Sequence, residues 1–177
     1  MDREDRGRVV KSRFHKIFSI TLIVLIVCTL SFTFTQSALS KEASTAVSEA
    51  VKDVIEVFLP SDTDAGEFVQ ENVRELAHFI EFAALGLFVS LYVALYMPAM
   101  GLSLCEKRYY VIASYVFAPI VALLDETIQI FSHRAPDILD VWLDTAGYAS
   151  LATLSYLGFF TVALVKARRA KESLKDD

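Results

Sequence analysis

Three groups of polar side chains have the residue types and the spacing that a binding or catalytic site requires. Their members are Arg74, His78 and Glu81; Asp125, Glu126 and Gln129; and Asp137, Asp140 and Asp144. Within each group, residues three or four positions apart would share one face of a helix. A further cation, Arg134, lies in the segment between the second group and the third.

The acidic members of these groups suit a site for a divalent cation. Asp137, Asp140 and Asp144 would supply the oxygen ligands that Mg²⁺, Mn²⁺ and Ca²⁺ prefer. Asp125 or Glu126 would support them. The sequence therefore predicts a cation site centred on the third group, although a purely structural network of ion pairs is an alternative.

The basic members suit chemistry on a phosphate or a glycan. Arg134 could bind a phosphate group through two parallel hydrogen bonds. His78 could transfer a proton, because an imidazole gains and loses protons near neutral pH. Phosphoryl transfer, glycosyl transfer or hydrolysis would suit this set. The chain contains no HExxH, P-loop or GxSxG motif, so no single reaction class is indicated.

Four long apolar segments position these groups. The segments are residues 17–34, 79–105, 109–124 and 145–165. Even the first, at 18 residues, would form a helix about 27 Å long, close to the ~30 Å hydrocarbon core of a bilayer. We therefore predict an all-α integral membrane protein built as a four-helix bundle. A cleaved signal peptide is the alternative for the first segment, but its length favours a retained anchor.

The basic residues indicate how the bundle lies in the membrane. Of the 17 Lys and Arg, residues 1–16 carry six, the loop after the second segment carries two and the tail carries five. By the positive-inside rule, both termini are then cytoplasmic. The predicted parts are a basic N-terminus (1–16), a first span (17–34), an extracytoplasmic loop (35–74), a core of three spans (75–165) and a basic tail (166–177).

This topology places all three polar groups at the extracytoplasmic end of the bundle. Ionisable groups near the edge of a bilayer cost free energy unless they are paired or hydrated, and by default they indicate function. We expect the bundle to turn them inward around a polar cavity.

The loop at residues 35–74 holds one predicted helix of its own. Apolar residues recur at helical spacing over Ser44–Leu59, and Pro60 would end the helix. This amphipathic helix would lie on the outer membrane interface or pack over the bundle. A lid over the site is a sharper alternative. The net charge of −5 argues against nucleic acid as a partner.

The ordered polar positions resemble those of the VanZ-like membrane protein family. The pattern runs Arg74-x-x-x-His78-x-x-Glu81-x-x-x-x-Gly86, then Asp125-Glu126-x-x-Gln129-x-Phe131-x-x-Arg134, then Asp140-x-x-x-Asp144-x-x-Gly147. The resemblance covers residues 70–165 and leaves out the first span and the acidic loop. By this resemblance, the characteristic polar positions of the family fall on His78, Glu126, Gln129, Arg134 and Asp140.

The resemblance implies a location and a biological setting. It implies a multi-pass protein of a bacterial plasma (inner) membrane that serves the cell envelope. The family takes its name from an accessory protein that gives low-level resistance to the glycopeptide antibiotic teicoplanin. Two departures from the family pattern stand out: Ser132-His133 replaces a common Pro-Gly, and Asp144 replaces a common Asn, which adds a carboxylate.

Three functions remain open from the sequence. The first is binding of membrane lipids, a cell-wall precursor or a glycopeptide, by Arg74, Glu81, Asp125, Gln129 and Arg134. The second is an enzyme acting on a lipid-linked phosphate or glycan, with His78, Glu126 and Asp140 as the catalytic residues and a divalent cation as cofactor. The third is a subunit of an ion-coupled transporter, which with four spans would need a homo-oligomer. Acids at one end only make transport the weakest of the three.

Overall fold

A computed structural model describes residues 3–99 and 104–173, and within them the chain is entirely helical apart from short connections. The six helices in this part of the chain are α1 (Arg3–Ser37), α2 (Lys41–Phe58), α3 (Asp64–Glu71), α4 (Val73–Ala99), α5 (Leu104–Phe131) and α6 (Ile138–Ser173). Four of them, α1, α4, α5 and α6, contain stretches long and apolar enough to cross a membrane. The all-α class and the four spans are therefore confirmed.

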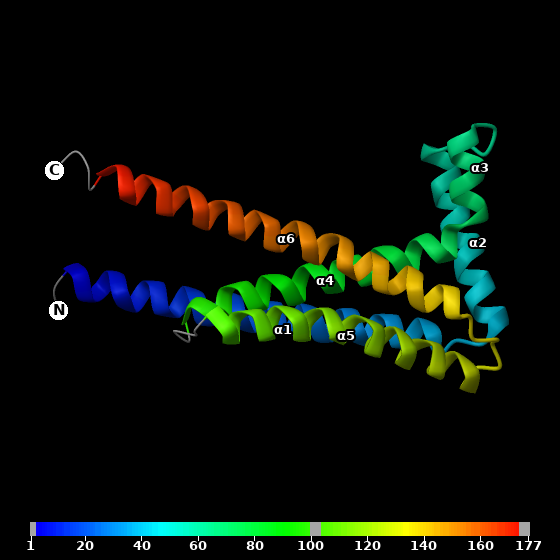
Figure 1. The fold of residues 1–177 in the computed structure, drawn as a ribbon. Coiled ribbons are helices and arrows are strands. Elements are labelled where there is room, and N and C mark those ends of the chain that lie inside the picture. The colour runs from blue at the N-terminus through cyan, green and yellow to red at the C-terminus, as the bar shows by residue number, and fades with distance from the viewer. Residues whose placement is uncertain (1–2, 100–103, 174–177) are drawn as a thin grey trace.

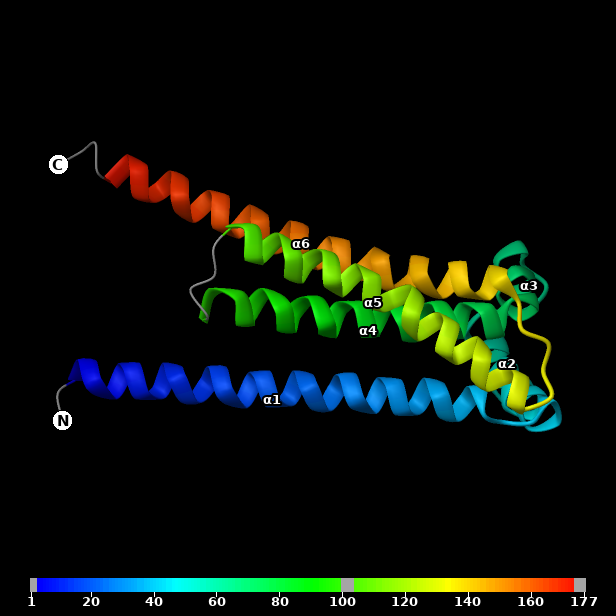
Figure 2. The same ribbon diagram turned by 60° about the horizontal axis from the view of Figure 1, so that its bottom comes forward.

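The long helices lie side by side, and α2 and α3 lie together at one end of them (Figures 1 and 2). The start of α1 and the end of α6 lie at the opposite end of the bundle. Successive long helices therefore run in opposite directions, as four consecutive crossings of a membrane require. It also puts the 35–74 segment at the same end as the α5–α6 connection.

The amphipathic helix expected at Ser44–Leu59 is α2, which begins three residues earlier and ends just before Pro60. Its N-cap is Ser40, whose side chain accepts a hydrogen bond from the N–H of Ala43 at 3.3 Å. A second short helix, α3, was not predicted. Thr63 caps it by accepting a hydrogen bond from the N–H of Gly66 at 3.0 Å.

The spanning helices are longer than the uncharged segments suggest. Helix α4 begins at Val73, six residues before the predicted span, and α5 continues past Asp125 to Phe131. Helix α6 begins at Ile138, seven residues before the predicted uncharged stretch. The charged ends stay helical because neighbouring helices supply partners for their side chains. Helix α4 ends at Ala99 and α5 already begins at Leu104, so the second span ends before the predicted residue 105. Residues 100–103 lie outside the described part of the chain.

The core forms where α4, α5 and α6 meet. Phe82, Leu85, Val121, Ala122 and Tyr148 are among its buried members. Helices α4 and α6 approach most closely at two glycines. A Cβ atom on Gly86 would lie 2.2 Å from the carbonyl oxygen of Tyr148, and one on Gly147 would lie 2.4 Å from that of Phe79. Only glycine allows this approach, as expected for packed membrane helices.

Candidate functional site

The polar residues predicted from the sequence meet at the end of the bundle that α2 covers. Helix α4 contributes Arg74, His78 and Glu81, α5 contributes Asp125, Glu126 and Gln129, and α6 contributes Asp144. Helix α1 adds Thr33 and Ser37. These nine residues are called the polar cluster below. Asp125, Glu126, Gln129, Asp144, Thr33 and Ser37 are buried, and the other three are half-buried.

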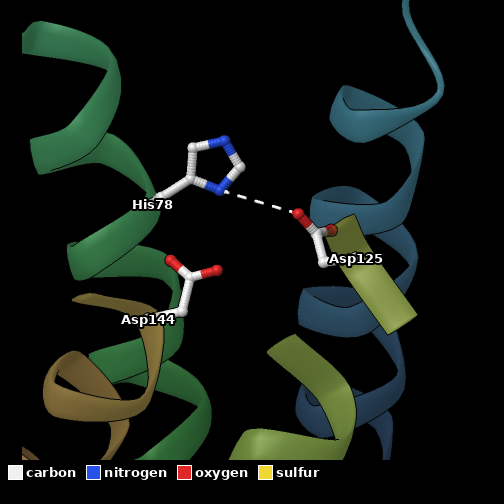
Figure 3. A group of neighbouring side chains, drawn as sticks. All are labelled: His78, Asp125 and Asp144. Carbon is white, nitrogen blue, oxygen red and sulfur yellow. Dashed lines mark ion pairs between the residues drawn. The ribbon is translucent and has the colours of Figure 1, made fainter. Parts of the chain in front are cut away.

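Asp125 lies at the centre of the polar cluster and is fully buried. Its Oδ1 accepts a hydrogen bond from the hydroxyl of Ser37 at 2.6 Å, and its Oδ2 accepts one from Nε2 of Gln129 at 3.2 Å. The Nδ1 atom of His78 lies 4.0 Å from Oδ2 (Figure 3). One carboxylate therefore connects three helices, α1, α4 and α5.

Gln129 links the acids of α5 to the arginine of α4. Its amide nitrogen donates to Asp125 and also to Oε1 of Glu126, at 2.6 Å. Its carbonyl oxygen accepts a hydrogen bond from Nη2 of Arg74 at 3.1 Å. An amide has both donors and an acceptor, so it can bridge groups that a charged side chain could not join.

Glu126 ties α5 to the start of α6. Its Oε2 accepts a hydrogen bond from the backbone N–H of Asp137 at 2.9 Å, one residue before α6 begins. The Oδ1 atom of Asp137 in turn accepts from the N–H of Leu139 at 2.8 Å, which caps α6. The side chain of Asp137 is exposed. Its interactions are those of a helix cap.

Asp144 differs from the other acids because it has no hydrogen-bond partner. It is 1% exposed, and among the described residues neither of its carboxylate oxygens meets a donor. Figure 3 shows the carboxylate directed into the space between His78 and Asp125. One ligand atom from each of these three residues lies within 4.8 Å of the others. Asp137 and Asp140, which we expected to join Asp144 at a metal, are not in this group.

Arg134 is the second buried group without a partner. It is 8% exposed, and its Nη2 meets no acceptor among the described residues. The turn before it is tight: His133 adopts a positive φ of 57°, and the N–H of Arg134 donates to the carbonyl of Gln129 at 3.1 Å. This turn returns the side chain toward the bundle. No carboxylate in the described part of the chain lies within ion-pair distance of it.

A cavity of about 180 Å³ lies beside the polar cluster. Its polar wall includes Arg74, His78, Glu81 and Arg134. Its apolar wall comes from α1, α2 and the turn between them, and it includes Phe32, Leu39, Val47 and Val51. A wider opening of about 530 Å³, nearer the loop, shares Arg74 and Arg134 and adds Lys41 and Lys52. Helix α2 therefore forms a wall of the cavity, as the lid interpretation requires.

Most of the predicted site residues lie close together in the structure, but they have different contacts. Asp140 is half-buried and lies beside Arg74, His78 and Asp144 along a narrow crevice. Glu81 accepts a hydrogen bond from Thr33 at 2.8 Å. Only Asp137 stands apart from the polar cluster.

The contribution of α1 to the polar cluster was not predicted. Thr33 and Ser37 donate to Glu81 and Asp125, and the carbonyl of Ser37 accepts from the hydroxyl of Ser132 at 3.0 Å. A signal was present, because Thr33 and Ser37 are four residues apart and would share a helix face at the end of an apolar span. Hydroxyl residues are common in membrane helices, however, so the signal was weak.

Comparison with known proteins shows which residues of the chain match a known family. The VanZ/LLP1 family model matches residues 17–162. The match begins at the first span, so the expected limits of 70–165 were too narrow, in keeping with the hydrogen bonds from α1. Neither a curated protein nor a solved structure matches the chain. With four candidate spans and a family match over most of its length, the chain is a membrane protein that belongs to the VanZ/LLP1 family.

Proposed function

We propose that this protein binds the anionic headgroup of a lipid or a lipid-linked cell-envelope precursor at the extracytoplasmic end of its bundle. The observation that carries the proposal is the buried side chain of Arg134 on the wall of a cavity, whose Nη2 meets no acceptor among the described residues. A buried charge without a partner costs several kcal/mol, so an anion is the natural complement. Phosphate and carboxylate fit a guanidinium best, because both can accept two parallel hydrogen bonds.

The cavity has the mixed lining that an amphiphile needs. Its charged wall suits a headgroup, and Phe32, Val47 and Val51 suit the first carbons of a chain. At about 180 Å³ it is far larger than the ~15 Å³ that one water molecule needs. Ligand sites commonly combine an apolar wall with a few convergent polar groups.

The position of the cavity also favours a lipid ligand. It lies at one end of four candidate spans, where headgroups of a bilayer would lie. The predicted apolar segments contain no Asp, Glu, Lys or Arg except Glu81, which lies near the start of the second. A translocation path should carry ionisable groups near the midplane, so this pattern favours binding at one face over transport.

The test is lipid retention by the purified, detergent-solubilised protein, measured by native mass spectrometry in the presence of phosphatidylglycerol and of undecaprenyl phosphate. We expect at least one of these lipids to be retained by wild type, and retention to fall at least tenfold in Arg134→Gln. The matched control is Arg169→Gln, which removes an exposed arginine at the other end of the bundle. Equal retention by all three proteins would contradict the proposal.

The same samples separate binding from catalysis. Incubation of wild type with undecaprenyl pyrophosphate, followed by assay of released inorganic phosphate, tests for turnover. Binding without release supports a binding protein, whereas release that His78→Ala abolishes would make the protein a hydrolase.

A role in teicoplanin resistance, which the family resemblance implies, would follow from capture of a cell-wall precursor. It is tested by the minimum inhibitory concentration in cells that produce wild type or Arg134→Gln.

A further inference from the structure

We propose that His78, Asp125 and Asp144 bind a divalent transition-metal ion, with Zn²⁺ and Mn²⁺ as the best-fitting candidates. The three residues come from three different helices, α4, α5 and α6, and their side chains converge (Figure 3). One ligand atom from each lies within 4.8 Å of the others. This site keeps Asp144 and the supporting Asp125 of the metal site expected from the sequence, but it replaces Asp137 and Asp140 with His78. It does not depend on the proposed lipid ligand.

The unpartnered carboxylate of Asp144 is the first argument for a cation. At 1% exposure, both of its oxygens lack a donor among the described residues. The Nδ1 atom of His78 also lacks a hydrogen-bond partner and lies 4.0 Å from Asp125 Oδ2. Buried polar atoms in proteins almost always have partners. A metal ion between these three side chains would give each of the unpartnered atoms a partner at once.

The local charge is the second argument. Five carboxylates surround this point, from Glu81, Asp125, Glu126, Asp140 and Asp144, and all are buried or half-buried. The guanidinium groups nearby are those of Arg74 and Arg134. Two positive charges leave most of the carboxylates uncompensated in a region of low dielectric constant. A divalent cation would offset the remainder at lower cost than isolated buried anions.

The donor set identifies the kind of metal. One imidazole nitrogen with two carboxylates suits Zn²⁺ or Mn²⁺, whereas Mg²⁺ and Ca²⁺ prefer oxygen ligands alone. Two of the three proposed ligands are closed to solvent, since Asp125 and Asp144 are 0% and 1% exposed. Mg²⁺ keeps several of its waters when bound, so it fits poorly.

The spacing of the ligand atoms is close to that of a bound ion. With metal–nitrogen and metal–oxygen bonds of about 2.0–2.2 Å, three ligand atoms around one ion lie about 3.3–3.8 Å from one another. The separation of 4.0 Å between His78 and Asp125 is slightly wider than this. The widest pair, at up to 4.8 Å, needs to close by about 1 Å, which side-chain rotation can provide. Hydrogen bonds from Ser37 and Gln129 already orient Asp125, as second-sphere groups do in metal sites.

The experiment is metal titration of the full-length, detergent-purified protein after chelation and desalting. We expect isothermal titration calorimetry with Zn²⁺ or Mn²⁺ to show one site per chain. Asp144→Asn and His78→Ala should each weaken binding at least tenfold. The matched control is Asp137→Asn, whose exposed carboxylate lies outside the group, and it should bind like wild type.

Two further measurements keep the result independent of folding and of the lipid. Added metal should raise the melting temperature of wild type and of Asp137→Asn but not that of Asp144→Asn, because only the folded site binds it. Arg134→Gln should retain the metal even where it loses lipid. The proposal is overturned if wild type binds neither metal, or if folded Asp144→Asn binds the metal as tightly as wild type.

Discussion

The two ends of this bundle are made by the same four helices but are joined by different interactions. At the polar cluster, carboxylates accept hydrogen bonds from Ser37 and Thr33 across helix boundaries, and Arg74 of α4 donates to Gln129 of α5. In the other half, α5 and α6 are joined by neutral hydroxyls. Ser114 and Tyr156 lie 2.9 Å apart, and Tyr115 and Thr153 lie 2.7 Å apart.

The difference shows that α5 and α6 can be joined without charged side chains. The half remote from the polar cluster holds α5 against α6 with neutral hydroxyls and close packing. Its unpartnered buried groups are the hydroxyls of Tyr148 and Ser155, which are neutral and cost less to bury than an ion. In the described part of the chain, the polar end instead leaves both oxygens of Asp144, in the polar cluster, and Nη2 of the neighbouring Arg134 without partners. Buried charged groups without partners cost stability and join no helices. A ligand that binds them best explains their presence.

The largest expected effect comes from breaking both regions at once, by separating α4 from α6. Gly86→Ala places a methyl group 2.2 Å from the backbone oxygen of Tyr148, so the helices must move apart. Because the clash is with rigid backbone, we expect a loss of more than about 4 kcal/mol or failure to fold. Gly147→Ala should act similarly, and it should also weaken metal binding, because it moves α4 and α6 apart close to His78 and Asp144.

Gly158→Ala is the matched control for both variants. A Cβ atom at Gly158 has nothing within 4 Å, so the same change should be neutral or slightly stabilising in a helix. The measurement is the fraction of monodisperse protein that survives heating in detergent. Equal melting temperatures for the three variants would show that the glycines do not set the helix approach.

A smaller effect should follow from breaking only the polar cluster. Gln129→Met keeps the length of the side chain but removes its hydrogen bonds to Arg74, Asp125 and Glu126. Buried polar groups that lose a partner cost about 1–3 kcal/mol each, partly recovered by relaxation, so we expect a loss of about 2–4 kcal/mol. The control Leu124→Met, on the same helix with a 50% exposed side chain, should change stability by less than about 0.5 kcal/mol. Denaturant unfolding monitored by the fluorescence of Trp142 measures both.

The polar cluster was largely predictable because its residues repeat at helical intervals at the ends of apolar segments. The spacing of Arg74, His78 and Glu81 fixes a common face whatever the rest of the chain does. Apolar runs of bilayer length likewise indicate membrane helices without reference to neighbours. These features are local, and local features can be recognised in a single sequence.

The partners within the cluster were not predictable, because they depend on how the helices rotate against one another. Asp137, Asp140 and Asp144 share a spacing, yet Asp137 caps α6 while Asp144 points toward His78 and Asp125. Helix α6 begins at Ile138, so Asp137 lies just outside the regular helix that was expected to hold it. The role of Ser37 depends on how α1 packs against α5, for which the sequence contains no direct signal.

The smallest effects compare one hydrogen bond from each region. Thr33→Val removes the hydroxyl that donates to Glu81 at 2.8 Å, and it should cost about 1–2 kcal/mol because the acceptor is a carboxylate. Its matched control is Thr29→Val, one turn earlier, whose hydroxyl bonds only to the Leu25 carbonyl of its own helix. Tyr156→Phe removes the bond to Ser114 and should cost only about 0.6 kcal/mol, typical of hydrogen bonds between membrane helices.

The pH dependence of these losses separates the two kinds of bond. A hydrogen bond to an ionised carboxylate is about twice as strong as one between neutral groups. The cost of Thr33→Val should therefore increase as the pH rises through the titration of Glu81. The cost of Tyr156→Phe should be the same at pH 5 and pH 8, since neither hydroxyl is charged at either value. Identical pH profiles for the two variants would mean that the polar cluster behaves like the rest of the bundle, and the contrast between the two halves would then have no electrostatic basis.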